Sequence, residues 1–318
     1  MEERNILGEE KIYKLLIKFS LPAIVGMTVN SLYNVVDRIF IGNSPDLGMN
    51  GLAGITIAFP IMIIIMAVGI LFGVGGATRF AIKLGEGDKE EAEKTLGSVF
   101  TMLIISSIVL TILGLIFLKP LVVLFGASEE VAPFAVEYLR IIILGSIFKI
   151  VSMGLNNIIR ADGSPKIAMY TMLIGAITNI ILDPIFIFGF RMGMFGAGLA
   201  TIIAQSLSFI WVILYFAGKR SNNKLRLRYM KPDLDIVKRV VGLGIPDSTL
   251  QIANSVLNTV LNRSLLFYGG DLAVSVMGII NSVATLLLLP VVGLRQGLQP
   301  IISFNYGAKK YPRVKQAL

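Results

Sequence analysis

Eight long apolar runs are the feature of this sequence that most constrains its fold. Each is about 20 residues or longer, which is the length that a helix needs to cross the hydrocarbon core of a bilayer. Inside lipid, such a run satisfies its own backbone hydrogen bonds when it is helical. The runs therefore predict an all-α polytopic membrane protein with about eight transmembrane helices. They extend over residues 13–42, 51–82, 97–125, 131–158, 165–190, 194–217, 236–268 and 271–304.

The composition supports a membrane protein and removes several classes of chemistry. Only 15% of the 318 residues are charged, against about 25% in soluble domains, and the mean hydropathy is +0.78. The chain has no cysteine and no histidine, which excludes thiolate nucleophiles, cysteine zinc clusters and histidine-containing triads. Proton chemistry near neutral pH would have to use carboxylates. We therefore expect a protein that is not an enzyme and needs no cofactor.

Basic residues fall between the apolar runs, which accounts for the net charge of +9 without a nucleic-acid partner. They gather at the N-terminus, after the second, fourth and sixth runs, and after the eighth. Because cytoplasmic loops are enriched in lysine and arginine, this pattern predicts an integral protein of a prokaryotic-type plasma membrane. Both the N-terminus and the end of the chain are expected in the cytoplasm.

An internal repeat relates the first two runs to the last two. At one constant offset Pro22 matches Pro246, and residues 30–36 match residues 254–260. Six crossings separate the copies, and because six is even, both copies cross the membrane in the same direction. This arrangement predicts two lobes related by a pseudo-two-fold axis along the membrane normal.

The repeat divides the chain into a six-helix lobe at 1–218, a basic cytoplasmic linker at 219–234, and the first two helices of a second lobe at 235–318. The linker could lie on anionic lipid headgroups or in solvent. A second lobe of two helices implies either a fragment or a partner that completes the bundle. We expect a fragment of a twelve-helix protein, with helices 9–12 in the full-length chain.

One carboxylate lies inside an apolar run. Asp183 is surrounded by the apolar residues of 167–190, where a charge costs about 2.5–3.5 kcal/mol on insertion scales. Asn179 lies one helical turn before it on the same face, and Asp37 comes from another run. We expect these groups beside a water-filled path. The alternatives are an Asp183 that bonds backbone groups freed by Pro184, and an interfacial Asp37 that pairs with Arg38.

Other polar residues in the runs have two interpretations each. Asn30, Asn34, Asn254 and Asn258 are spaced to line a cavity, but could equally form hydrogen bonds between helices. Arg295 could face the same cavity or lie near the cytoplasmic end of its helix.

Several stretches resemble the multidrug and toxic compound extrusion (MATE) family, in an order that covers nearly the whole chain. They are Pro22 with NSLYNVVDRIFIG at 30–42, GEGDKEEAEK at 85–94, RADGSP at 160–165, NIILDPIF at 179–186 and GMFGAGLAT at 193–201. The resemblance implies a twelve-helix antiporter that exports drugs and organic cations in exchange for H⁺ or Na⁺, here truncated after its eighth helix. It implies membrane lipids and amphipathic or cationic small molecules as partners.

The resemblance also assigns residues. It implies a cation-coupling site, and a Na⁺ site if the ion is sodium, at Asp37, Asn179, Asp183 and Thr201. Tyr138 matches a further position of the cation-coupling site, and Asn156 matches one deeper toward the cytoplasm. Counting residues along the helices puts Asp37, Asp183, Thr201 and Tyr138 at one level, toward the extracellular side.

Two rivals to drug antiport are kept. A flippase for lipid-linked saccharides shares the helical layout, and basic residues in its cavity would favour it; Lys149 and Arg295 are the candidates here. An intramembrane enzyme could use a pair of aspartates, but needs them in close contact with a shared proton. The chain has no GxxxxGK[ST] phosphate loop, which argues against ATP-driven transport.

Overall fold

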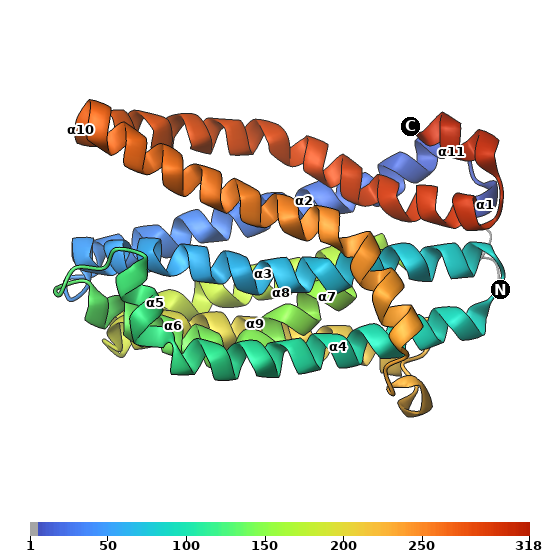
Figure 1. The fold of residues 1–318 in the computed structure, drawn as a ribbon, viewed down its shortest axis with the longest axis horizontal. Coiled ribbons are helices and arrows are strands. Elements are labelled where there is room, and N and C mark those ends of the chain that lie inside the picture. The colour runs from blue at the N-terminus through green and yellow to red at the C-terminus, as the bar shows by residue number, and fades with distance from the viewer. Residues whose placement is uncertain (1–5) are drawn as a thin grey trace.

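The structure of the chain, a computed structural model, describes the backbone of residues 6–318 and, between residues 258 and 286, the side chains of only some positions. Helices form nearly all of the described chain (Figure 1). In order they are α1 (Ile6–Glu9), α2 (Ile12–Asn43), α3 (Gly48–Gly85), α4 (Lys89–Ile116), α5 (Leu118–Leu124), α6 (Ala132–Leu144), α7 (Ser146–Ala161), α8 (Pro165–Pro184), the π-helix η2 (Ile185–Gly189), α9 (Gly193–Ala217), the 3₁₀-helix η3 (Leu227–Tyr229), α10 (Leu234–Gly307) and α11 (Tyr311–Ala317).

The all-α polytopic architecture expected from the apolar runs is confirmed. In the described residues, six helices are long and apolar enough to cross a membrane: α2, α3, α4, α8 with η2, α9, and the part of α10 at 287–307. The expected span at 131–158 is also helical, but Gly145 divides it into α6 and α7. The expected span at 236–268 is the first limb of α10, which doubles back at its far end (Figure 1).

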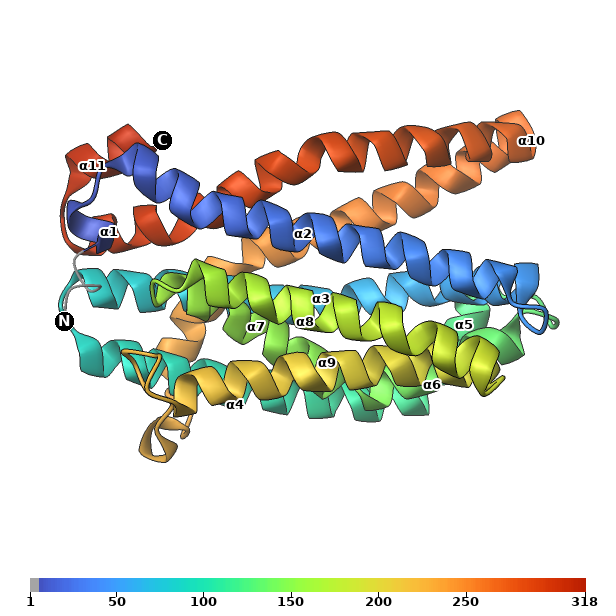
Figure 2. The same ribbon diagram turned by 180° about the vertical axis from the view of Figure 1, so that it is seen from behind.

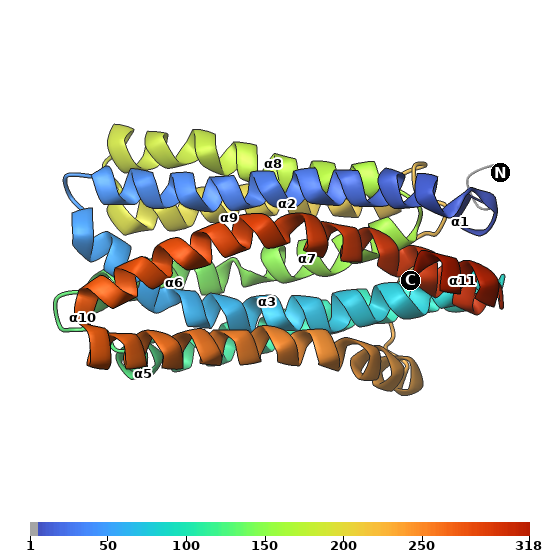
Figure 3. The same ribbon diagram turned by 90° about the horizontal axis from the view of Figure 1, so that it is seen from above.

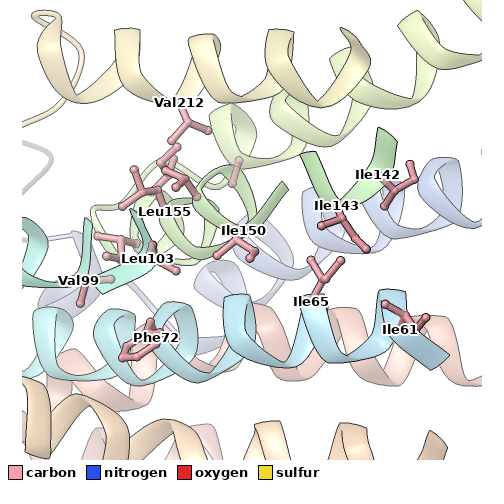
Figure 4. Close-up of a cluster of buried hydrophobic side chains, with 14 of the residues drawn as sticks. Ile61, Ile65, Phe72, Val99, Leu103, Ile142, Ile143, Ile150, Leu155 and Val212 are labelled. Atoms are coloured by element: carbon pink, nitrogen blue, oxygen red, sulfur yellow. The ribbon is translucent and has the colours of Figure 1, made fainter. Parts of the chain in front are cut away.

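Hydrophobic side chains from α2 to α10 form the core of the bundle, and most of them come from α3, α4, α6, α7 and α9. Figure 4 shows part of this cluster, where α3 faces α4, α6 and α7, and α9 closes the far side. Glycines allow a closer crossing of α3 with α10. A Cβ on Gly75 would overlap the main-chain oxygen of Val240, and one on Gly244 would overlap that of Leu71. The two helices therefore touch through their backbones.

At one end of the bundle, α10 packs against α1 and α3. This end, which we call the basic end, holds both termini, α1, α11 and the turn between α3 and α4 (Figures 1 and 2). Here Asn305 Nδ2 donates to Leu7 O over 2.9 Å, and Gln299 Nε2 donates to Thr78 Oγ1 over 2.8 Å. Farther along, Ser248 Oγ bonds the main-chain oxygen of Ala67 at 3.0 Å.

Toward the opposite end, α10 diverges from α2 and α3 (Figure 2). Seen from above, α2, the returning limb of α10, α3 and the outgoing limb of α10 follow one another across the bundle (Figure 3). The outgoing limb therefore lies beyond α3, and the returning limb lies between α3 and α2.

The basic segment before α10 is fastened to the earlier helices by two buried carboxylates. Asp162, in the turn between α7 and α8, accepts hydrogen bonds from Tyr215 Oη at 2.6 Å, Ser221 Oγ at 2.7 Å and Asn223 Nδ2 at 2.5 Å. Burial raises the pKa of Asp162, and these donors partly oppose the rise. We call this cluster the Asp162 staple.

Glu93 of α4 makes the second attachment. Its Oε2 pairs with Arg226 Nε at 2.7 Å, and its Oε1 accepts the backbone N–H of Lys224 at 3.1 Å. Thr101 Oγ1, two turns along α4, bonds Met230 O at 2.6 Å. Residues 221–230 are thus held against α4 and the α7–α8 turn rather than extended freely into solvent.

Replacing the acceptor at the centre of the Asp162 staple should release this segment. In Asp162→Ala, three donors lose their shared acceptor, and an unsatisfied buried group costs about 1–3 kcal/mol. We expect trypsin to cut at Lys219, Arg220 and Lys224 much faster than in the wild type, measured by time-resolved mass spectrometry. The exposed Asp46 provides the matched control Asp46→Ala, which should leave the cleavage rate unchanged. Equal rates in the two variants would contradict the staple.

Candidate functional site

Four polar side chains from three helices meet inside the bundle. Asp183 and Asn179 lie on one face of α8, as their spacing predicts, and Asn179 Nδ2 bonds Asp183 Oδ1 at 3.2 Å. The same amide nitrogen lies 3.3 Å from Thr201 Oγ1 on α9. Asp37 of α2 completes the group, and its carboxyl lies close enough to that of Asp183 for the two to interact electrostatically. We call these four residues the carboxylate cluster.

The carboxylate cluster is buried but short of hydrogen-bond donors. Asp183 is fully buried, and Asp37 is only 8% exposed. Three oxygens of the carboxylate cluster are buried without a hydrogen-bond partner in the described structure: Asp37 Oδ1, Asn179 Oδ1 and Asp183 Oδ2. Buried polar groups are nearly always satisfied, so several such oxygens in one place mark the cluster as a candidate functional site.

The described contacts of the two acids differ in part from those that their alternative roles predict. Asp183 precedes Pro184, and the helix does change there into the π-helix η2. Its described hydrogen bond is to Asn179, however, and its other oxygen lacks a donor. Asp37 faces Asp183 from inside the bundle, whereas an interfacial residue would face outward.

Two tyrosines border the cluster. Tyr138 on α6 is 2% exposed and lies beside Thr201, at the level expected for it. Tyr33 lies one turn before Asp37 on α2, close to both acids, and was not anticipated from the sequence. Its spacing from Asp37 is the signal that could have identified it.

A cavity of about 570 Å³ extends from the cluster into the bundle. Asn179 and Thr201 belong to its wall, whereas Asp37 and Asp183 lie behind them. Asn30, Asn34, Asn156, Asn254 and Arg295 also line it, and the side chain of Asn258 lies outside the described residues.

Several of these lining residues also make hydrogen bonds within the protein. Asn34 Nδ2 bonds the main-chain oxygen of Asn30 at 2.7 Å, and Asn156 Nδ2 bonds that of Ala168 at 2.8 Å. Arg295 pairs with Asp247, which lies on the other limb of α10. Asn34 therefore lines the cavity while its described hydrogen bond stays within α2, whereas Asn156 both lines the cavity and joins α7 to α8.

Arg160 is buried inside the bundle, whereas the pattern of basic residues predicts it in a solvated connection. Arg160 was counted with the charges of a cytoplasmic connection, but it belongs to the last turn of α7 and is only 6% exposed. It lines the cavity, and its guanidinium donates to Asn156 Oδ1 at 2.7 Å and to Asn157 Oδ1 at 2.5 Å. Its helical spacing from Lys149 and Asn156 was the available signal.

Comparison with known proteins agrees with this arrangement. A family model described as MatE matches residues 22–185 and 248–318. The multidrug export protein MepA of Staphylococcus haemolyticus (strain JCSC1435) is 30% identical over 310 residues, which are 97% of this chain and 68% of that protein. MepA of Staphylococcus aureus (strain N315) is 30% identical over 314 residues, with 98% and 68% coverage.

A solved structure shares the fold. It is the outward-facing conformation of a multidrug resistance MATE family transporter of the MOP superfamily, with a TM-score of 0.92 and 27% identity. The match covers 100% of this chain and 70% of that one. Fold, matched residues and relatives together show that this chain belongs to the MatE family of multidrug and toxic compound extrusion transporters.

Proposed function

We propose that the protein is a secondary active exporter of drug-like small molecules, driven by the inward movement of H⁺ or Na⁺. The carboxylate cluster is the observation that carries this proposal. Two acids from α2 and α8 meet in a buried place where three oxygens lack donors, directly behind the wall of a cavity of drug-like size. The multidrug export relatives support the direction and the class of substrate.

A bound cation would lower the electrostatic free energy of the carboxylate cluster. Two facing carboxylates removed from water repel each other and have lost their hydration. A proton shared between them removes one charge. Alternatively, Na⁺ would find oxygen ligands on Asp37, Asn179, Asp183 and Thr201, the kind of ligand that hard cations prefer. Either cation favours the arrangement in which α2 and α8 are closed together.

Helix α2 contributes both to the carboxylate cluster and to the wall of the cavity. Besides Asp37, α2 carries Met27, Asn30 and Asn34, which line the cavity. A shift of α2 when the cluster binds its cation therefore changes the shape of the cavity wall. Because a ligand can move an equilibrium only by binding one state better, cation and drug would favour different positions of α2.

The remaining expectations form part of the same proposal. We infer a plasma-membrane protein whose basic end lies in the cytoplasm. Residues 1–218 would act as one lobe and residues 235–318 as part of the other, joined by the linker at 219–234.

Neutralising either acid should uncouple transport from the ion gradient. In proteoliposomes with separately imposed H⁺ and Na⁺ gradients, wild-type protein should drive the efflux of ethidium with one of the two ions. Asp183→Asn and Asp37→Asn keep the size of the side chain but cannot exchange a cation, so their efflux should fall to that of protein-free vesicles. The exposed control Asp46→Asn should behave as wild type. Ion-driven efflux by Asp183→Asn at the wild-type rate would refute the proposed coupling.

The amide of Asn179 should stabilise the cluster itself. Asn179→Leu removes the donor shared by Asp183 and Thr201, which leaves a buried carboxylate without that partner and should lower stability by about 1–3 kcal/mol. Asn34→Leu is the matched control, because Asn34 is exposed and bonds only its own helix in the described contacts. Thermal unfolding in detergent at fixed pH and salt compares the two. Equal melting temperatures would show that Asn179 does not hold the cluster.

A further inference from the structure

One face of α4 is apolar and exposed over much of its length. Ile105, Ile108, Val109 and Ile112 are between 44% and 53% exposed and follow one another at the spacing of helical turns. Because α4 is long and apolar enough to cross a membrane, we expect this face to contact acyl chains. Thr101 belongs to the same face, one turn before Ile105.

The linker lies against the continuation of this face. Thr101 Oγ1 donates to the main-chain oxygen of Met230 over 2.6 Å, and a Cβ on Gly97 would overlap the main-chain oxygen of Tyr229. Lys94 is the last charged residue of α4, and Thr101 lies about 10 Å farther along the helix. The linker therefore lies at the depth where α4 becomes apolar, which is the depth of lipid headgroups rather than of bulk solvent.

The exposed side chains at this place are apolar and basic together. Leu227 and Leu234 are 83% and 73% exposed, and Arg228, Lys231 and Lys238 are exposed beside them. We call these five residues the interfacial patch. None of its three cations forms an ion pair with a residue that the structure describes. Leucines with lysine and arginine are the side chains that bind at the boundary of headgroups and acyl chains.

The charge around the patch is positive. Residues 224–239 include six basic side chains and two acids, Asp233 and Asp235. Of these, Arg226 is already paired with Glu93, and Asp233 caps the first turn of α10. The remaining excess of cations favours a headgroup with a net negative charge over a zwitterionic one.

The patch is open to the side of the bundle. The linker projects beside α4, on the opposite side of that helix from α2 and the returning limb of α10 (Figures 1 and 2). A molecule in the plane of the membrane could therefore reach the patch from the side of α4.

We propose that the interfacial patch binds anionic phospholipid in the leaflet at the basic end. Leu227 and Leu234 lie among the first methylenes of the acyl chains, and Arg228, Lys231 and Lys238 lie against the phosphates. The lipid is a bound partner at the edge of the protein and not its cargo. The inference is independent of what the protein exports, and only the name of the leaflet, the cytoplasmic one, rests on the proposed orientation.

The fluorescence of an indole placed in the patch reports which lipid lies beside it. Trp211 is the only tryptophan of the chain, so Trp211→Phe with Leu227→Trp leaves one reporter at an exposed position. The protein is reconstituted in equal mixtures of phosphatidylglycerol and phosphatidylcholine. In each mixture one lipid carries bromine near the headgroup end of its acyl chains, where it quenches an adjacent indole.

Both lipids should quench the reporter, and phosphatidylglycerol should be preferred about fivefold or more, the effect of one or more cations at an anionic surface. Trp211→Phe with Ile112→Trp is the matched control. It places the indole on the same face of α4 but beside acyl chains, far from the patch. Its quenching should be the same for the two lipids.

Charge variants in the reporter background show which cations hold the lipid. Arg228→Gln with Lys231→Gln should lower the preference to about twofold or less, and so should about 1 M salt, where the screening length is only about 3 Å. Lys309→Gln with Lys315→Gln removes an equal charge from exposed positions elsewhere at the basic end and should leave the preference unchanged. Thermal unfolding in detergent confirms that each variant is folded.

Three outcomes would overturn the inference. A reporter at position 227 that neither lipid quenches would place the linker in solvent. Equal quenching by the two lipids would leave an apolar contact without recognition of the headgroup. A preference that survives in Arg228→Gln with Lys231→Gln, or falls as far in Lys309→Gln with Lys315→Gln, would assign it to the charge of the whole protein. Loss of ion-driven ethidium efflux in the wild type would remove the export function and leave the lipid preference intact.

Discussion

The arrangement of this protein depends on the cost of keeping two carboxylates out of water. Asp37 and Asp183 come from helices far apart in the sequence, and their meeting requires α2 and α8 to pack side by side. The amide of Asn179 supplies part of what Asp183 lost on leaving water, but three oxygens in the cluster remain without donors. Under the proposed function, a cation that shares this site would stabilise it, and the packing of the two helices would then respond to an ion.

Hydropathy alone was sufficient for most of the architecture, because lipid restricts an apolar span to one secondary structure. The divisions within spans were harder to predict. Gly145 separates α6 from α7 inside a run with no loop composition, and α10 reverses direction without a break in its helical assignment. Both depend on tertiary packing, which a sliding count of apolar residues does not contain.

The site shows a similar limit. Asp183 and Asn179 could be placed on one face from their spacing, since the helix fixes that geometry locally. The approach of Asp37 and Thr201 depended on resemblance, and Tyr33 was missed beside an acid already selected. Arg160 was missed for another reason. Counting basic residues by connection treats every arginine near a helix end as solvated, whereas this one turns inward to two amides.

The contacts that hold residues 221–230 against α4 also fix the position of the start of α10. Met230 is tied to Thr101, and Asp233 caps the first turn of α10 through the backbone N–H of Asp235 at 2.8 Å. Only Lys231 and Pro232 lie between these two anchors, a reach of about 10 Å when fully extended. The start of α10 is thus held close to α4. Because the start of α10 is held in place, any tilt of this helix would displace its far end much more than its start.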